Sequence, residues 1–140
     1  MTDQADRYDR IALGYARWWA PIIAPQAVSL LDRLEPAIAA GAKRVVDIGT
    51  GTGTLAIAAL RRWPGIDVVG IDASSGMADV AAAEADRLLG PADRRRFMTR
   101  VAFADDLPFP DASFDVAMSS FVFSSAAEKS LPWATASVCL

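Results

Sequence analysis

Three glycines stand at alternate positions in residues 45–53, which read VVDIGTGTG. The apolar residues before them are typical of a buried parallel strand, and the residues after them have helical character. Because glycine has no Cβ, such a loop turns tightly and lets a ligand approach its backbone. The free amides at the start of the following helix favour polar or anionic groups. The segment therefore predicts a strand, a ligand-binding loop and a helix, although a tight turn without a ligand stays open.

Apolar runs and helical segments alternate along most of the chain. Strands are predicted at residues 44–48, 67–71, 100–103 and 114–118. Helical character is predicted for residues 8–34, 52–63 and 75–89, with breaks at Pro36 and Gly41 and a capping residue at Ser74 or Ser75. Strands that alternate with helices form βαβ units, whose crossovers place helices against the faces of a parallel sheet. We therefore predict an α/β protein with a parallel sheet.

The composition excludes several classes of site. The 140 residues include no histidine and a single cysteine, Cys139. A Ser–His or Cys–His nucleophile, a histidine base, an internal disulfide and a multi-cysteine zinc site are therefore impossible within this chain. We expect no metal. A net charge of −3 gives no overall basic field, so we expect no nucleic-acid partner either.

The chain also lacks signs of export or membrane insertion. Its first ten residues, MTDQADRYDR, are charged and lack the apolar centre of a secretory signal. The longest uncharged stretch, residues 18–31, is shorter than a span of about 20 residues and contains two prolines. These features predict a cytoplasmic protein without a membrane span.

Two acidic residues flank the predicted ligand loop. Asp47 comes directly before the glycines, and Asp72 ends the next predicted strand, where one carboxylate can accept both hydroxyls of a ribose. A dinucleotide fingerprint needs glycine at position 54, which is Thr54, and a pyrophosphate would be repelled by Asp47. A nucleoside with a cationic amino-acid tail fits better than a nicotinamide cofactor. The alternative that Asp72 is only a charge at a helix start stays open.

Three ordered motifs carry a family resemblance. Residues 46–53 (VDIGTGTG), 70–77 (GIDASSGM) and 107–115 (LPFPDASFD) resemble the successive motifs of class I S-adenosylmethionine-dependent methyltransferases, in the small-molecule and quinone-type group. Residues 8–12 (YDRIA) are similar to the amino-terminal helix of that group. The resemblance, which covers about residues 8–123, implies a Rossmann-like parallel sheet with flanking helices. It also implies methyl transfer from S-adenosyl-L-methionine to a small-molecule acceptor.

The resemblance further implies a set of cofactor-binding residues. Asp47 and the glycine loop would hold the methionine portion, and Asp72 would bind the ribose hydroxyls. Ala73 and Met77 would pack on the adenine, Tyr15 would close over the cofactor, and the backbone of Ala104 would contact the adenine ring. The set is Tyr15, Asp47, Gly49, Thr50, Gly51, Gly53, Asp72, Ala73, Met77, Ala104 and Asp105. An ordinary core position for Met77 and a packing role for Tyr15 stay open, and no catalytic residue is identified.

The chain departs from the family before its third motif. Family members usually have Gly-Asp-Ala there, and the aspartate reaches the adenine amino group, whereas this chain has Ala102, Phe103 and Ala104. The Phe103 side chain cannot accept a hydrogen bond. Asp105 or Asp106 could replace the missing acceptor, or both could be solvated loop charges.

Family members also continue beyond the fourth strand, whereas the residues after Ser124 no longer resemble the family. We therefore expect a truncated chain, from a shifted reading frame or a shortened gene. We divide it into an N-terminal helical segment (1–42), a cofactor-binding core (43–124) and a divergent tail (125–140). An inactive remnant that serves as a cofactor-binding or protein-interaction module is the alternative to an active enzyme.

An incomplete sheet has a physical consequence. With about four strands in the order 3-2-1-4, the helices would lie mainly on one face, and residues 104–113 are too few to cover the other. The fourth strand would be an open edge. We therefore predict an exposed apolar surface beside Phe114, Val116 and Met118, and hence marginal stability, self-association through the uncovered face or the need for a partner.

Overall fold

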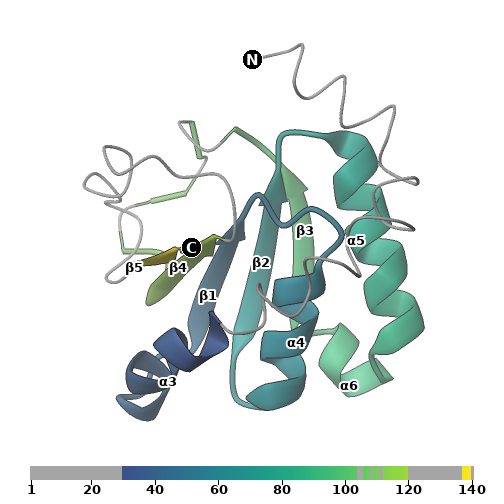
Figure 1. Cartoon of the computed structure of the whole chain (residues 1–140). Helices are drawn as coiled ribbons and strands as arrows, with labels where there is room; N and C mark the ends of the chain where they lie inside the picture. The colour runs from purple at the N-terminus through teal and green to yellow at the C-terminus, as the bar shows by residue number, and fades with distance from the viewer. Residues whose placement is uncertain (1–29, 104–105, 108, 111, 120–136, 140) are drawn as a thin grey trace.

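One parallel sheet organises the chain. The computed structural model describes residues 30–103, 106–107, 109–110, 112–119 and 137–139. Its strands are β1 (Arg44–Ile48), β2 (Asp67–Asp72), β3 (Phe97–Val101), β4 (Val116–Ser119) and β5 (Ser137–Cys139). They pair in parallel in the order β3-β2-β1-β4-β5 (Figure 1). The predicted α/β fold and the order of the first four strands are confirmed, and β5 extends the sheet by one strand.

Helices connect these strands. The described helices are α3 (Leu31–Ala39), α4 (Thr54–Arg62), α5 (Ser75–Leu88) and the short α6 (Pro91–Arg94). The structure selects Ser74 as the cap of α5, because its Oγ accepts a hydrogen bond from the Met77 amide at 3.1 Å. The predicted break at Pro36 is wrong, since α3 continues through that residue. Within the described residues, no helix has the length and apolar character needed to cross a bilayer.

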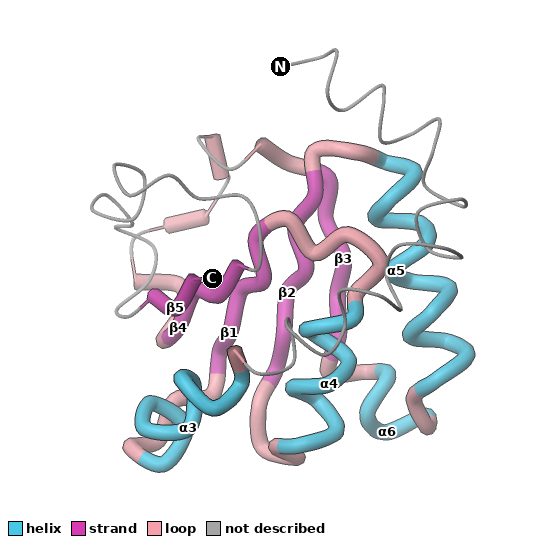
Figure 2. The backbone as a smooth tube through the Cα atoms, in the orientation of Figure 1, coloured by secondary structure: helices cyan, strands magenta, loops and turns pink. Residues whose placement is uncertain are grey.

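The two faces of the sheet belong to two apolar clusters, because successive strand residues point to opposite sides. Val45, Val68 and Val116 belong to a cluster that also contains buried residues of α3, α4 and α5. Val46 and Ile71 belong to a second, smaller cluster. Figures 1 and 2 show α4 and α5 on the near side of the sheet, so the larger cluster lies between the helices and the strands.

The second face is covered near β4, contrary to the prediction of an exposed apolar surface. On this face Phe114 and Ala117 are only 3% and 0% exposed, whereas Val116 and Met118, both 0% exposed, belong to the cluster on the helix side. The ring of Phe109 packs edge-on against Phe114, with centroids 4.9 Å apart, and Leu107 packs against the same cluster. The link before β4 therefore does cover part of this face, because its apolar side chains turn inward. The predicted open edge at the fourth strand is also wrong, because β5 pairs with β4.

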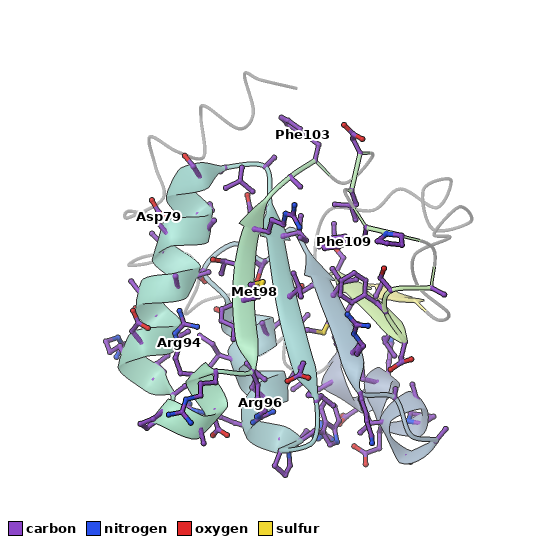
Figure 3. All side chains as sticks on the ribbon, turned by 180° about the vertical axis from the view of Figure 1, so that it is seen from behind. Asp79, Arg94, Arg96, Met98, Phe103 and Phe109 are labelled. Atoms are coloured by element: carbon purple, nitrogen blue, oxygen red, sulfur yellow. The ribbon has the colours of Figure 1, made fainter. Side chains whose placement is uncertain are left out.

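Exposed apolar side chains lie on β3 instead. This strand covers residues 97–101 rather than the predicted 100–103, and it forms the edge of the sheet beside β2. Met98 is 64% exposed and Val101 is 52% exposed. Figure 3 shows Met98 on the side of the sheet opposite α4. Self-association through the second face therefore has no support around β4 and stays an untested prediction.

Arg96 closes the turn between α4 and β2. Its guanidinium donates hydrogen bonds to the carbonyl oxygens of Leu60, Trp63 and Ile66 at 2.6–3.1 Å. It also pairs with the Asp93 carboxylate at 2.8 Å. Its side chain is only 17% exposed, so solvent screens these contacts weakly. Arg96 therefore satisfies carbonyl groups that the end of α4 leaves without helical partners.

We expect the Arg96→Ala substitution to lower the free energy of unfolding by about 2–3 kcal/mol, because it leaves part-buried carbonyl oxygens without a charged donor. Urea unfolding followed by circular dichroism measures the change. Arg95→Ala is the matched control, because Arg95 is the exposed neighbour and the substitution removes the same charge. Equal stabilities of the two variants would contradict the role assigned to Arg96.

Candidate cofactor site

The glycine loop begins at the carboxyl end of β1 (Figure 2). Gly49, Gly51 and Gly53 have φ values of 71°, 56° and 79°, in the left-handed region that favours glycine. The amides of Gly49 and Thr50 both donate to the Ile71 carbonyl oxygen, at 2.8 and 2.9 Å. The loop is therefore held against the end of β2, and all three predicted glycines are required by its shape.

Asp47 lies beneath this loop as a buried carboxyl group. It is 1% exposed, and its Oδ2 accepts a hydrogen bond from the Thr50 hydroxyl at 2.8 Å. Its Oδ1 is buried and has no hydrogen-bond partner among the residues that the structure describes. Burial raises the pKa of Asp47 to about 7; the Thr50 hydrogen bond lowers it, and the nearby charge of Asp72 raises it further. An unpaired buried acceptor of this kind is suited to a cationic donor from a ligand.

Asp72 joins the first and second sequence motifs. Its Oδ2 accepts a hydrogen bond from the Gly51 amide at 2.9 Å, and its Oδ1 accepts one from the Ser74 amide at 3.0 Å. A carboxylate oxygen can accept more than one hydrogen bond, so these contacts leave capacity for ribose hydroxyls. The half-buried position keeps the group next to solvent. The structure thus brings Asp72 to the glycine loop, as the sequence predicted.

Gly70 has a role that the sequence analysis missed. A Cβ at this position would lie 2.8 Å from the Thr50 Oγ1 and 3.0 Å from the Phe97 ring. The absence of a side chain therefore lets Thr50 occupy the position from which it donates to Asp47. The available signal was a glycine inside a strand, which often marks the close approach of another group.

The residues predicted around the adenine are only partly described. Ala73 is half-buried beside Asp72, and Met77 is 2% exposed, as expected for a core residue of α5. Asp106 is exposed, and its amide donates to the Phe103 carbonyl oxygen at 3.0 Å. Tyr15, Ala104 and Asp105 lie outside the described residues. Contact of these residues with adenine stays a prediction.

The last aspartate of the third motif supports the fold. Asp115 Oδ2 accepts hydrogen bonds from the amides of Lys43 and Arg44, at 2.8 and 3.0 Å. These two bonds lower the pKa of the Asp115 carboxyl below its usual value. Because Arg44 begins β1 and the glycine loop follows its end, Asp115 lies away from the site and fixes β1 to the start of β4.

The described side chains fit the predicted cofactor. S-adenosyl-L-methionine carries an ammonium group and two ribose hydroxyls, and the site offers the unpaired Asp47 Oδ1 and the Asp72 carboxylate. The loop residues 49–53 carry no charged side chain that would compete for Asp47. The arrangement therefore suits a cationic nucleoside better than a pyrophosphate.

Comparison with known proteins supports this assignment. Residues 45–139 match the family model described as a methyltransferase domain. The prediction that the residues after Ser124 do not resemble the family is therefore wrong, since the match continues to residue 139. The chain is 33% identical over 123 residues to a demethylmenaquinone methyltransferase of Deinococcus radiodurans, covering 85% of this chain and 45% of that protein. It is 40% identical over 81 residues to the enzyme of the same name from Thermus thermophilus, covering 58% of this chain and 34% of that protein.

A solved structure agrees with the sequence relatives. Geranyl diphosphate C-methyltransferase from Streptomyces coelicolor A3(2), in complex with Mg²⁺, geranyl diphosphate and S-adenosyl-L-homocysteine, has a TM-score of 0.56 and 27% sequence identity. The alignment covers 69% of this chain and 34% of that one. The chain thus spans less than half the length of each relative named here. The family match, the order of the strands and the two joined motifs show that the chain belongs to the methyltransferase-domain family of class I S-adenosylmethionine-dependent methyltransferases.

Proposed function

We propose that this chain binds S-adenosyl-L-methionine at the glycine loop and serves in the transfer of its methyl group to a small molecule. The observation that carries the proposal is the buried Asp47 Oδ1, which has no partner among the described residues and lies under the loop to which Asp72 is bonded. The family membership and the S-adenosyl-L-homocysteine bound to the Streptomyces enzyme support the same ligand.

Each described residue has a distinct task in this proposal. Asp47 pairs with the ammonium group, and Asp72 accepts the ribose hydroxyls while it holds the Gly51 amide. The loop glycines allow the ligand to approach the backbone closely. When bound, the cofactor supplies a methyl group activated by a sulfonium, so the chain has mainly to orient it toward an acceptor and exclude water.

A quinone-type acceptor is the best-supported substrate class. The two sequence relatives named above are demethylmenaquinone methyltransferases, and the structural neighbour methylates another small molecule, geranyl diphosphate. The Asp47, Gly51 and Asp72 part of the site lies within residues 43–124, the predicted cofactor-binding core. A cytoplasmic location stays a prediction.

Isothermal titration calorimetry with S-adenosyl-L-methionine tests the proposal, with NAD as the competing ligand. We expect saturable heat for S-adenosyl-L-methionine and a higher melting temperature in its presence, with neither effect for NAD. Transfer of a labelled methyl group to a demethylmenaquinone then tests the acceptor. Saturation by NAD alone would support a nicotinamide site instead, and the absence of heat and thermal shift with S-adenosyl-L-methionine would refute cofactor binding.

A further inference from the structure

The carboxyl group of Asp47 lacks a compensating positive charge in the described part of the chain. The group is buried, Thr50 donates to Oδ2, and Oδ1 has no described partner. A buried carboxylate with one neutral donor pays a large desolvation penalty, which the group avoids by holding a proton. The geometry therefore favours the neutral carboxylic acid as long as no cation is present.

The charged groups on the surrounding elements do not reverse this preference. They are Asp67 and Asp72 on β2, Asp115 before β4, Asp32, Arg33 and Glu35 on α3, Arg61 and Arg62 on α4, and Asp79, Glu84, Asp86 and Arg87 on α5. Asp72 is the neighbour whose charge acts on Asp47, and its like charge opposes ionisation. Arg61 and Arg62 lie in the last turn of α4, at the opposite end of that helix from the glycine loop.

The residues that pair with Asp47 in the sheet carry no charge. Its register partners are Gly70 on β2 and Met118 on β4, neither of which titrates.

Two charged side chains on the helices have other surroundings. The Arg62 guanidinium forms ion pairs with Asp32 and Glu35 of α3, at 2.9 and 3.1 Å. Asp79 is exposed on α5, where Figure 3 places it on the outer side of the helix.

We propose that Asp47 holds a proton in the free protein in mildly acidic solution, in part up to neutral pH, and releases it to solvent when the ammonium group of the cofactor pairs with Oδ1. The inference rests on the proposed function and adds a regulatory property to that site. One O–H bond of the carboxyl group breaks, the proton passes to the buffer, and the carboxylate is retained by the ammonium. Cofactor affinity then depends on pH.

The sign and size of this dependence follow from linkage. Since one proton must leave before the ion pair forms, acidification below the pKa of free Asp47, about 7, weakens binding. Between about pH 8 and pH 6 the affinity falls about tenfold. Thr50→Val removes the hydroxyl that stabilises the carboxylate, so it moves the midpoint to higher pH, whereas Thr50→Ser keeps the donor and the midpoint.

Two measurements test the inference on the full chain. Titration with S-adenosyl-L-methionine at about pH 6.5, in phosphate and in imidazole buffers, gives the number of protons released from the difference in heat. Carbon-13 NMR of labelled aspartate carboxyl groups in the free protein gives the titration of Asp47 directly, assigned by its loss in Asp47→Asn. We expect release of most of one proton and a carboxyl that titrates near pH 7, with a higher midpoint in Thr50→Val and an unchanged one in Thr50→Ser.

The outcomes separate this inference from the proposed function. Binding of S-adenosyl-L-methionine with equal heats in both buffers, and an Asp47 carboxyl that titrates near its ordinary value, would overturn the inference and leave the proposed function in place. Failure of S-adenosyl-L-methionine to bind at any pH would overturn both, and the NMR titration would still show whether free Asp47 holds a proton. The cofactor can itself gain or lose protons when it binds. This contribution is measured with the Asp47→Asn variant if that variant still binds, and otherwise by titrating the free cofactor with acid and base.

Discussion

Replacing Asp72 with alanine weakens the binding of S-adenosyl-L-methionine by about 1–3 kcal/mol, because charged hydrogen bonds to the ribose are lost. The effect has a second source in the structure. Asp72 also accepts hydrogen bonds from the amides of Gly51 and Ser74, so its removal frees the glycine loop from β2. Isothermal titration calorimetry of the variant and the wild type measures the loss.

Asp67→Ala is the matched control for this experiment. Asp67 begins the same strand, is exposed, and carries the same charge, but it lies at the opposite end of β2 from the loop. We expect the Asp67 variant to bind with wild-type affinity. Titrations with adenosine and with methionine separate the two causes of weaker binding. Loss of the ribose contacts weakens the binding of adenosine alone, whereas a displaced loop weakens the binding of both ligands. An Asp72→Ala protein that binds as tightly as the control would refute the assigned role.

Replacing Asp47 with asparagine raises the free energy of unfolding at about pH 8 by about 1–3 kcal/mol, because a buried charge is exchanged for a neutral group of the same shape. In the wild type the pKa of Asp47 rises from 3.8 in the unfolded chain to about 7 in the folded one. Between these two values the folded state binds more protons than the unfolded state. The contribution of Asp47 to the free energy of unfolding of the wild type is therefore largest below about pH 4, and it is lost as the pH rises through 7.

The ionisation of Asp47 lowers the free energy of unfolding of the wild type by about 4 kcal/mol at most, because of the difference between its two pKa values. Asp115 contributes with the opposite sign, because its pKa is lowered: its stabilisation is present above the unfolded value and is lost as the pH falls through the folded value. That window lies below 3.8, the unfolded value, so it does not overlap the range in which Asp47 acts.

Urea unfolding between about pH 4.5 and pH 8 measures the predicted slope. We expect the wild type and an Asp67→Asn control to lose stability together as the pH rises, and Asp47→Asn to lose much less. Parallel curves for all three proteins would show that Asp47 ionises in the folded state as easily as in the unfolded one. The experiment needs no ligand, so it tests the buried carboxyl group independently of cofactor binding.

The sequence predicted the central strands and the loop well because their signals are local. Residues 44–48 form β1 as predicted, since a continuous apolar run followed by glycine is typical of a strand buried on both faces. The glycine loop and Asp72 also meet as predicted, because the carboxyl ends of neighbouring parallel strands lie at one edge of the sheet. Periodicity and residue type were sufficient for these elements.

Other features depend on contacts that the sequence does not display. The strand β3 begins three residues before the predicted start, because the polar Thr99 and Arg100 separate Phe97 and Met98 from the apolar residues that follow. Three-residue β5 was not predicted, since a strand this short has too few residues to show alternation. The inward packing of Phe109 on Phe114 does not follow from the length of the link, because it depends on the direction in which its side chains point.

The hydrogen bond from Gly51 to Asp72 joins residues 21 positions apart and belongs to two different motifs. Neither motif is therefore a self-sufficient module: the bend after β1 keeps its shape partly through an acid supplied by the next strand. A substitution at Asp72 therefore changes the environment of the first motif as well as that of the second. Transfer of the glycine loop to another protein would therefore also require the acid at the end of β2.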